Sequence, residues 1–380
     1  MSFPHDFGRR NSLRVPTTLG LLALLAAAAA AGTAAPALAA TATLVVNGQA
    51  GSDTGNCVSA PCSTLQYALD QAATGDTIEI EGAVKASDSA TFGGAVIPTS
   101  ISTLSIVGVG GAYPPQLSGG LTAGEMGSTV TVQSGETVAI SNLEIADGVA
   151  QKGGGIYNTG NLTLDNVVVN SNSAAPITLI CSQVTKYCQG LGAGGGIYNE
   201  GSLTLWRSAV VGNVVGNSFI TSAPPAGGEV YLDGGGIYNL GSLAIYDSSV
   251  AENSAAPSSS PVPQSAAGGG IFNLAEGVQV VASTIYKNFA TVGAGIFQES
   301  GIGVPTMDLG ASLVVENAAS SGGLSSECAA GPGVPPPTSL GYNAADSEAA
   351  PGCGLSQPTD GVSSSPQVDN GLSRYAYGLL

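Results

Sequence analysis

Short segments in which every second residue is apolar recur along much of the chain. The clearest occupy residues 162–164, 203–205, 243–245, 278–280 and 307–309. Alternation of apolar and polar residues predicts a β-strand with one buried face. Ten residues after the start of each segment the chain has an asparagine, and these are Asn172, Asn213, Asn253, Asn288 and Asn317.

A glycine-rich hexapeptide precedes each of these segments. Its form is Gly-Gly-Gly-Ile-Tyr/Phe-Asn, or GAGIFQ in the last copy, and the copies begin at Gly153, Gly194, Gly234, Gly268 and Gly293. A motif that recurs every 25 to 41 residues predicts a solenoid whose coils pack on their neighbours. We therefore predict an all-β fold, a right-handed parallel β-helix, in which the asparagines form a ladder along the turns.

The regions on either side of these repeats carry weaker patterns. Residues 63–73 place apolar side chains on one helical face after a serine, which predicts a short N-terminal capping helix over the open end of the core. We expect a signal peptide at 1–40, an N-terminal cap and first coils at 41–100, the parallel β-helix at 101–320, and a Pro/Gly-rich segment with closing coils at 321–380.

The first forty residues have the pattern of an export signal. Arg9, Arg10 and Arg14 precede an apolar run at 19–31 and a small-residue segment at 37–39. The adjacent arginines leave twin-arginine export open as an alternative to the general route. No later segment has the roughly twenty apolar residues of a membrane-spanning helix. We therefore expect a secreted or cell-surface protein with no transmembrane helix in its mature part.

The chain is strongly acidic, with a formal net charge of −17 from 26 acidic and nine basic residues. Removal of residues 1–40 takes away Asp6, three arginines and His5, the only histidine, and leaves 25 acidic and six basic residues. This charge excludes nucleic acid as a partner and means that a charged partner should be cationic or bridged by a cation. Acidity that serves only solubility is the alternative.

Six cysteines fall into three close pairs. They are Cys57 with Cys62, Cys181 with Cys188, and Cys328 with Cys353. In an exported chain, nearness in sequence favours these three disulfides among the fifteen pairings that six cysteines allow. We expect no metal site in them, because the chain has no Cys-x-x-Cys pair and no histidine in its mature part.

Three segments together resemble a known group of proteins. The first is CSTLQYALD from Cys62 with GDTI from Gly75, the second is the GGGIYN coils, and the third is SLGYN from Ser339 with CGL from Cys353 and SPQVD from Ser365. They are similar to secreted bacterial right-handed parallel β-helix proteins of pectin-lyase-like architecture, with repeats like those of polymorphic outer-membrane proteins and an opening like the CSLREA segment. The resemblance implies the fold, and its better-known members act as adhesins.

Stacking the coils brings the only tryptophan and a basic residue together. The two neighbouring columns are Asp165, Trp206 and Tyr246, and Asn166, Arg207 and Asp247. We expect Arg207 near Asp247 and Trp206 near Tyr246, as a flat aromatic surface flanked by charge that suits sugar rings. An exposed turn with an ion pair and no ligand is the alternative.

Two further features are candidate binding surfaces. Insertions at 173–193, 214–233 and 254–267 leave successive coils at the same place, and the first carries Tyr187 between Cys181 and Cys188. Loops held on a rigid scaffold are frequent binding sites, although tolerated length variation explains them equally well. The other feature is an aromatic column that we expect to pack, with a sugar-stacking stripe as the alternative, formed by Tyr157, Tyr198, Tyr238, Phe272 and Phe297.

The missing histidine excludes a polygalacturonase-like site, and no nucleophile triad or phosphate loop is present. Our leading expectation is a non-catalytic module that binds a carbohydrate or a cell-surface glycan, without a cofactor. The first alternative is a pectate-lyase-type enzyme that uses Arg207 with Asp165 and Asp247, with or without Ca²⁺. The second alternative is a structural component of the cell envelope.

Overall fold

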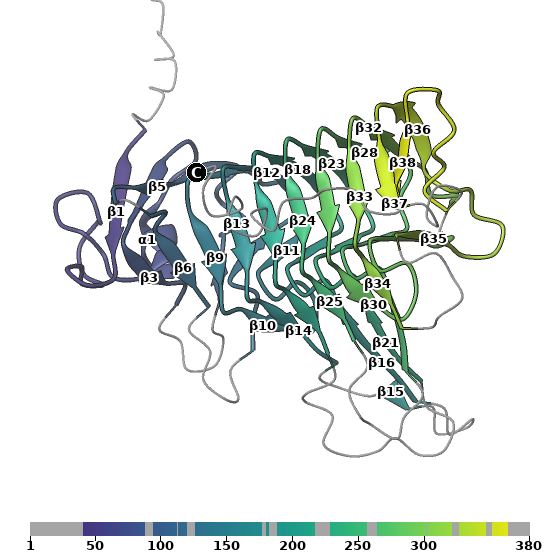
Figure 1. Ribbon diagram of the computed structural model, residues 1–380. Coiled ribbons are helices and arrows are strands. Elements are labelled where there is room, and N and C mark those ends of the chain that lie inside the picture. The colour runs from purple at the N-terminus through teal and green to yellow at the C-terminus, as the bar shows by residue number, and fades with distance from the viewer. Residues whose placement is uncertain are drawn as a thin grey trace, which may run out of the picture. The chain divides into compact units, whose positions relative to one another are not determined.

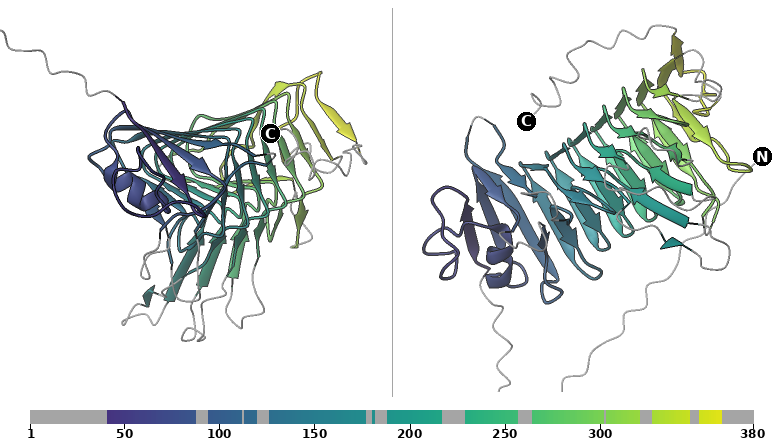
Figure 2. Two further views of the ribbon diagram at one scale, coloured as in Figure 1. Left: turned by 90° about the vertical axis from the view of Figure 1, so that its left-hand side faces the viewer. Right: turned by 90° about the horizontal axis from the view of Figure 1, so that it is seen from below.

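The computed structural model describes residues 41–87, 94–111, 113–119, 126–176, 180–181, 188–216, 229–256, 264–301, 303–320, 327–346 and 352–363. These residues form a solenoid of short parallel strands, with one short helix among them. The strands follow one another along the stack in sequence order (Figure 1), and two further views show the same succession (Figure 2). The predicted all-β, parallel β-helix fold is confirmed.

Three sheets surround the main core. Sheet A contains β1 (Thr43–Asn47), β2 (Thr77–Glu81), β5 (Thr103–Val109), β8 (Thr137–Ser141), β12 (Asn161–Asp165), β18 (Ser202–Trp206), β23 (Ser242–Tyr246), β28 (Val278–Val281), β32 (Met307–Gly310) and β36 (Thr338–Gly341). Sheet B contains β3 (Ala83–Lys85), β6 (Gln116–Ser118), β9 (Glu144–Ala146), β13 (Val168–Asn170), β19 (Ala209–Val211), β24 (Ser249–Ala251), β29 (Thr284–Tyr286), β33 (Leu313–Val315), β37 (Ala344–Asp346) and β38 (Gly361–Ser363). Sheet C contains β4 (Ala95–Val96), β7 (Val130–Val132), β11 (Ile156–Asn158), β17 (Ile197–Asn199), β22 (Ile237–Asn239), β27 (Ile271–Asn273), β31 (Ile296–Gln298) and β35 (Cys328–Ala330).

Two smaller sheets extend from this core. Sheet D contains β10 (Val149–Ala150), β14 (Ser173–Ala174), β20 (Val214–Val215), β25 (Ser254–Ala255), β30 (Phe289–Ala290) and β34 (Ala318–Ala319). Sheet E contains β15 (Ile180–Cys181), β16 (Cys188–Ala193), β21 (Glu229–Asp233) and β26 (Gln264–Ala267). A central coil runs through sheets C, A, B and D, and then through sheet E before the next strand of sheet C.

Equivalent residues of successive coils lie directly over one another. Leu162 pairs with Leu203, which pairs with Leu243, and each of these side chains is at most 2 % exposed. The inward side chains of sheets A, B and C form one continuous apolar core. Burial of each leucine, isoleucine or valine in such a core contributes about 1.5–3 kcal/mol relative to an exposed side chain.

The five asparagines lie in one buried file, the asparagine ladder, at the corner between sheets B and D. The side-chain amide of Asn213 donates to Oδ1 of Asn253 at 3.0 Å and to the carbonyl of Val169 at 2.8 Å. Its own Oδ1 accepts from the backbone N–H and the side-chain amide of Asn172, at 3.1 and 3.0 Å. The same bonds continue through Asn288. Each amide therefore serves both neighbouring coils.

Each end of the asparagine ladder has its own partner. At the first coil, the backbone N–H of Gly148 donates to Oδ1 of Asn172 at 2.9 Å. At the last coil, the N–H and the side-chain amide of Asn317 donate to the buried carboxyl group of Glu327. The bonds from one asparagine to the next thus all run towards the C-terminal end.

Two other files have the same polarity. The first runs through Asn158, Asn199, Asn239, Asn273 and Gln298 and ends on the carbonyl of Pro335. In the second, hydroxyl oxygens accept backbone N–H donors of the preceding coil, through Ser208, Ser248, Ser283 and Ser312, and the file ends on Asn343 and Asp360.

The first and third glycines of the repeated hexapeptide each have a steric reason. Gly153 has φ +62°, and a Cβ there would lie 2.1 Å from the carbonyl oxygen of Ile156. A Cβ on Gly155 would lie 2.8 Å from the amide nitrogen of Asn172. The glycines therefore make room for the turn and for the asparagine ladder.

The N-terminal end of the core is covered by helix α1 (Leu65–Gln71), which buries Leu65 and Leu69. Its N-cap is Thr64, whose hydroxyl accepts from the N–H of Tyr67 at 3.3 Å, whereas the sequence suggested Ser63. The difference arises because Asp53 accepts from the N–H of Ser63 and from the hydroxyl of Thr64, which sets the chain entry one residue later.

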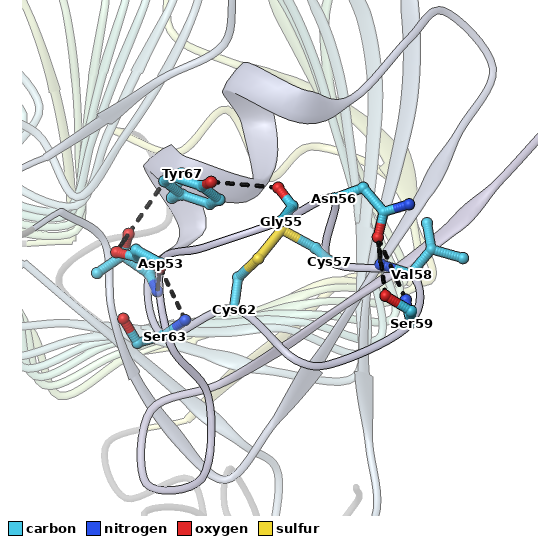
Figure 3. The surroundings of a disulfide bond; sticks show 10 residues. Asp53, Gly55, Asn56, Cys57, Val58, Ser59, Cys62, Ser63 and Tyr67 are labelled. Carbon is cyan, nitrogen blue, oxygen red and sulfur yellow. Dashed lines mark hydrogen bonds between the residues drawn. A yellow bond between two sulfur atoms is a disulfide. The ribbon is translucent and has the colours of Figure 1, made fainter.

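Disulfides hold the segments at both ends of the stack. Cys57 and Cys62 are bonded below α1, where the Tyr67 hydroxyl donates to the carbonyl of Gly55 at 3.1 Å (Figure 3). At the other end Cys328 is bonded to Cys353, and both are buried in the main core.

Candidate functional site

The residues singled out from the sequence meet at the corner between sheets A and B, which we call the A–B corner. Trp206 is the last residue of β18 and pairs with Asp165 on one side and Tyr246 on the other. The residue that follows each of them has a left-handed backbone that turns the chain into sheet B. These residues are Asn166 (φ 59°), Arg207 (φ 45°) and Asp247 (φ 47°).

Arg207 forms an ion pair with Asp165 of the preceding coil. Its Nε lies 3.0 Å from Oδ1 of Asp165, and its Nη2 lies 2.6 Å from Oδ1 and 2.5 Å from Oδ2. We expected Arg207 near Asp247, but Asp247 acts only as a further charge, because the long side chain reaches back and not forward. The hydrogen bonds and charge of Asp165 raise the pKa of Arg207. The guanidinium is thus held in its charged form.

Trp206 and Tyr246 stack on each other, with ring centroids 4.6 Å apart and planes 29° apart. Trp206 is 41 % exposed, and the Tyr246 hydroxyl donates to Oε1 of Gln279 at 2.6 Å. The stacked rings cover one face of each other, and Trp206 stays partly exposed. Trp206 therefore lies against Tyr246, as expected from the stacking of the coils.

Apolar groups continue from this pair along the outer face of sheet A. Tyr246 pairs with Val281, and Val281 pairs with Gly310. The side chain of Leu340 lies beside Gly310 and is 59 % exposed, because Leu340 is at an outward position of β36. The site at the A–B corner is thus one end of a longer apolar stripe.

The second aromatic column packs inside the molecule. Tyr198 stacks on Tyr238 at 5.0 Å and Tyr238 on Phe272 at 4.9 Å, and all three side chains are at most 9 % exposed. They pack against Ala193 and Ala267 of sheet E. These faces are covered and do not form an open stripe.

One buried acid beside this column had not been singled out from the sequence. Asp233 ends β21, where the neighbouring strands have Ala193 and Ala267, and it is only 6 % exposed. Burial raises the pKa of Asp233 to about 8, with the hydrogen bond from the Ala267 N–H opposing this rise and Glu299 adding to it. The signal in the sequence is a lone acid directly before the GGGIYN motif.

The insertions contribute paired strands and not only loops. Their first residues form sheet D, their last residues form sheet E, and a small apolar cluster lies between these sheets, with Val215, Val230 and Leu232 as its largest members. The backbone of Cys181 is paired antiparallel with that of Cys188. The expected Cys181–Cys188 bond concerns side chains outside the described residues, and Tyr187 also lies outside them.

In the part of the chain that the structure describes, no three histidine, cysteine, aspartate or glutamate side chains come together as a metal site requires. In the same part, no helix is long and apolar enough to cross a membrane. The chain matches no family model, no curated protein and no solved structure.

Proposed function

We propose that the protein is a secreted or cell-surface, non-catalytic binding protein that presents the A–B corner to a carbohydrate or another cell-surface ligand. The observation that carries this proposal is Trp206, a large aromatic side chain left 41 % exposed on a strand that is hydrogen-bonded on both sides. Exposed aromatic side chains with a fixed orientation are frequent anchors of binding sites. The disulfides Cys57–Cys62 and Cys328–Cys353 support an oxidising, extracellular location.

The groups around Trp206 suit a polar ring such as a sugar. The indole is 41 % exposed, and the Arg207–Asp165 pair beside it offers donors and acceptors for hydroxyl groups. Both side chains of the pair are well exposed, at 64 % and 40 %, so that they can rearrange around a ligand. We also propose that the protein is related to adhesin-like proteins of pectin-lyase-like architecture. The parallel β-helix and the segments that begin at Cys62 and Ser339 support this relationship.

The lyase alternative has weaker support. A lyase of the pectate type needs a base that releases its proton, and Asp165 instead raises the pKa of Arg207. Neither Asp165 nor Asp247 belongs to a cluster in the described residues that could hold Ca²⁺. Binding without turnover therefore has the better geometric support.

A glycan array probed with the mature chain, residues 41–380, tests the proposal. We expect a restricted set of glycans to bind, and Trp206→Ala to weaken their binding by tenfold or more, since it removes the anchor. Phe289→Ala is the matched control, because Phe289 is a similarly exposed aromatic residue on sheet D. It should leave binding unchanged.

The same preparation separates the alternatives. Release of unsaturated product from uronate polysaccharides with Ca²⁺, abolished by Arg207→Ala, would establish a lyase and overturn the proposal. Absence of both binding and turnover would leave a structural envelope role.

A further inference from the structure

A cleft of about 620 Å³ opens at the A–B corner near the N-terminal end of the stack. This volume is within the range of roughly 300–1,000 Å³ that is usual for small-molecule sites. The lining comes from the ends of β2 and β5 and from the chain that leads to β6, and includes Glu81, Ala83, Val109, Tyr113, Pro114 and Pro115.

The cleft exists because this corner is longer than the others. Between β12 and β13 the corner needs only Asn166 and Val167, whereas residues 110–115 connect β5 to β6. Gly110 and Gly111, both with φ +83°, turn the chain away from the strand. Two consecutive prolines then fix their own φ angles, so the wall of the cleft is largely preformed.

The lining is mainly apolar, with one ionised residue, Glu81, and one amide side chain, Gln116. Tyr113 is 82 % exposed, and no lysine, arginine or histidine is among the described residues that line the cleft. Among the described lining residues the only carboxylate is that of Glu81, whose Oε2 accepts from the side-chain amide of Asn47 at 3.1 Å and is thereby held in place. Lys85, the nearest base along β3, lines a separate hollow with Ser118.

We propose that this cleft binds an organic cation whose charge is surrounded by apolar groups, such as a quaternary ammonium group. The proline rings, Val109 and the Tyr113 ring contact the apolar groups, and the Glu81 carboxylate complements the charge. The face of the Tyr113 ring attracts a cation as well, through a cation–π interaction. The net charge of −17 raises the local concentration of cations further.

This site is independent of the proposed function. The cleft is formed at β2 and β5, and β8 and β12 separate these strands from β18, which carries Trp206. A failure of either proposal therefore leaves the other intact.

Titration with choline, followed by nuclear magnetic resonance, tests the site. The comparison ligand is the uncharged analogue in which carbon replaces the quaternary nitrogen. We expect saturable binding of choline, with the analogue on the order of fivefold weaker, because an exposed charge contact contributes up to about 1 kcal/mol. Glu81→Gln should bring choline to the level of the analogue, and Tyr113→Ala should weaken both ligands.

Two controls make the outcome decisive. Glu252→Gln removes one negative charge at a distant corner and should leave the affinity for choline unchanged. Circular dichroism should show that each variant keeps the wild-type fold. Equal affinity for the two ligands, unchanged choline binding by Glu81→Gln, or no saturable binding to the wild type would each overturn the proposal.

Discussion

Two columns of the same solenoid differ in whether the residue type repeats from coil to coil. The asparagine ladder inside the coil has the same residue at every step from Asn172 to Asn317. The A–B corner, outside the same coils, has the same left-handed backbone at every step, but its residues differ. They are Asn142, Asn166, Arg207, Asp247, Ala282 and Ala311, with φ between 45° and 59°.

The difference follows from what each position must satisfy. A buried asparagine must donate to one coil and accept from the other, so any other side chain leaves polar groups unpaired on both sides. The A–B corner requires only a backbone conformation, and its side chains point into water. Chemistry can therefore vary at the corner without loss of the fold, and the candidate binding residues lie there.

The largest expected effect comes from the same substitution made in each column. Asn213→Ala leaves buried amide and carbonyl groups of two coils unpaired, and we expect it to lower the free energy of unfolding by about 3 kcal/mol. Asn166→Ala at the A–B corner loses one exposed hydrogen bond and strains a backbone with φ 59°, for about 1 kcal/mol. Urea unfolding monitored by circular dichroism measures both, and equal losses would refute the distinction.

The next largest effect on the free energy of unfolding, on the order of 1–3 kcal/mol, concerns Glu327 at the end of the asparagine ladder. Burial raises the pKa of Glu327 to about 9 from its ordinary 4.5, with Asn317 opposing the rise and Asp346 supporting it. The contribution of this carboxyl to stability is therefore full below about pH 4.5 and is lost as the pH rises towards 9. We expect Glu327→Gln to remove this decline, which melting curves from pH 5 to 9 would measure.

The serine file ends on Asp360, whose pKa is lowered and not raised. We expect Asp360 to have a smaller effect on stability than Glu327. Burial alone would raise the pKa of Asp360, but hydrogen bonds from Ser339, Gln357 and Asn343 outweigh it and lower that pKa. Its contribution is present above the ordinary value of 3.8 and is lost as the pH falls through the lowered value. Asp360→Asn should flatten the acid limb of the melting curve below pH 4. A steeper acid limb in this variant would contradict the assignment.

The smallest expected effect is a gain in stability. Ala282 has φ 50° at the A–B corner, where only glycine is free of strain. Ala282→Gly should raise stability by about 0.5 kcal/mol, since relief of the strain exceeds the entropy that glycine adds to the unfolded chain. A loss of stability in urea unfolding would show that the alanine side chain packs at this corner.

The sequence predicts the interior of this molecule better than its exterior. The hexapeptides and the spaced asparagines indicate the coil and the identity of its stacked positions, because those positions repeat. Sheets D and E were missed, since the strands of sheet D are only two residues long and those of sheet E lie in insertions of unequal length.

The candidate site shows the same limit. Stacking correctly placed Trp206 beside Tyr246, but it predicted Asp247 as the neighbour of Arg207, whereas the ion pair forms with Asp165. That choice depends on side-chain torsions, which a repeat does not encode. Glu327 and Asp360 end their files outside the repeats, so the periodicity gave no signal for them.

The common direction of the bonds between equivalent side chains of successive coils gives the solenoid a polarity and makes one coil its repeating unit. The side chains of a whole coil inserted in the middle would form hydrogen bonds with both neighbouring coils. An inserted fraction of a coil would leave these groups without their partners. Proteins built on this plan are therefore free to lengthen or shorten over evolutionary time by duplication or deletion of entire turns, while the terminal caps stay as they are.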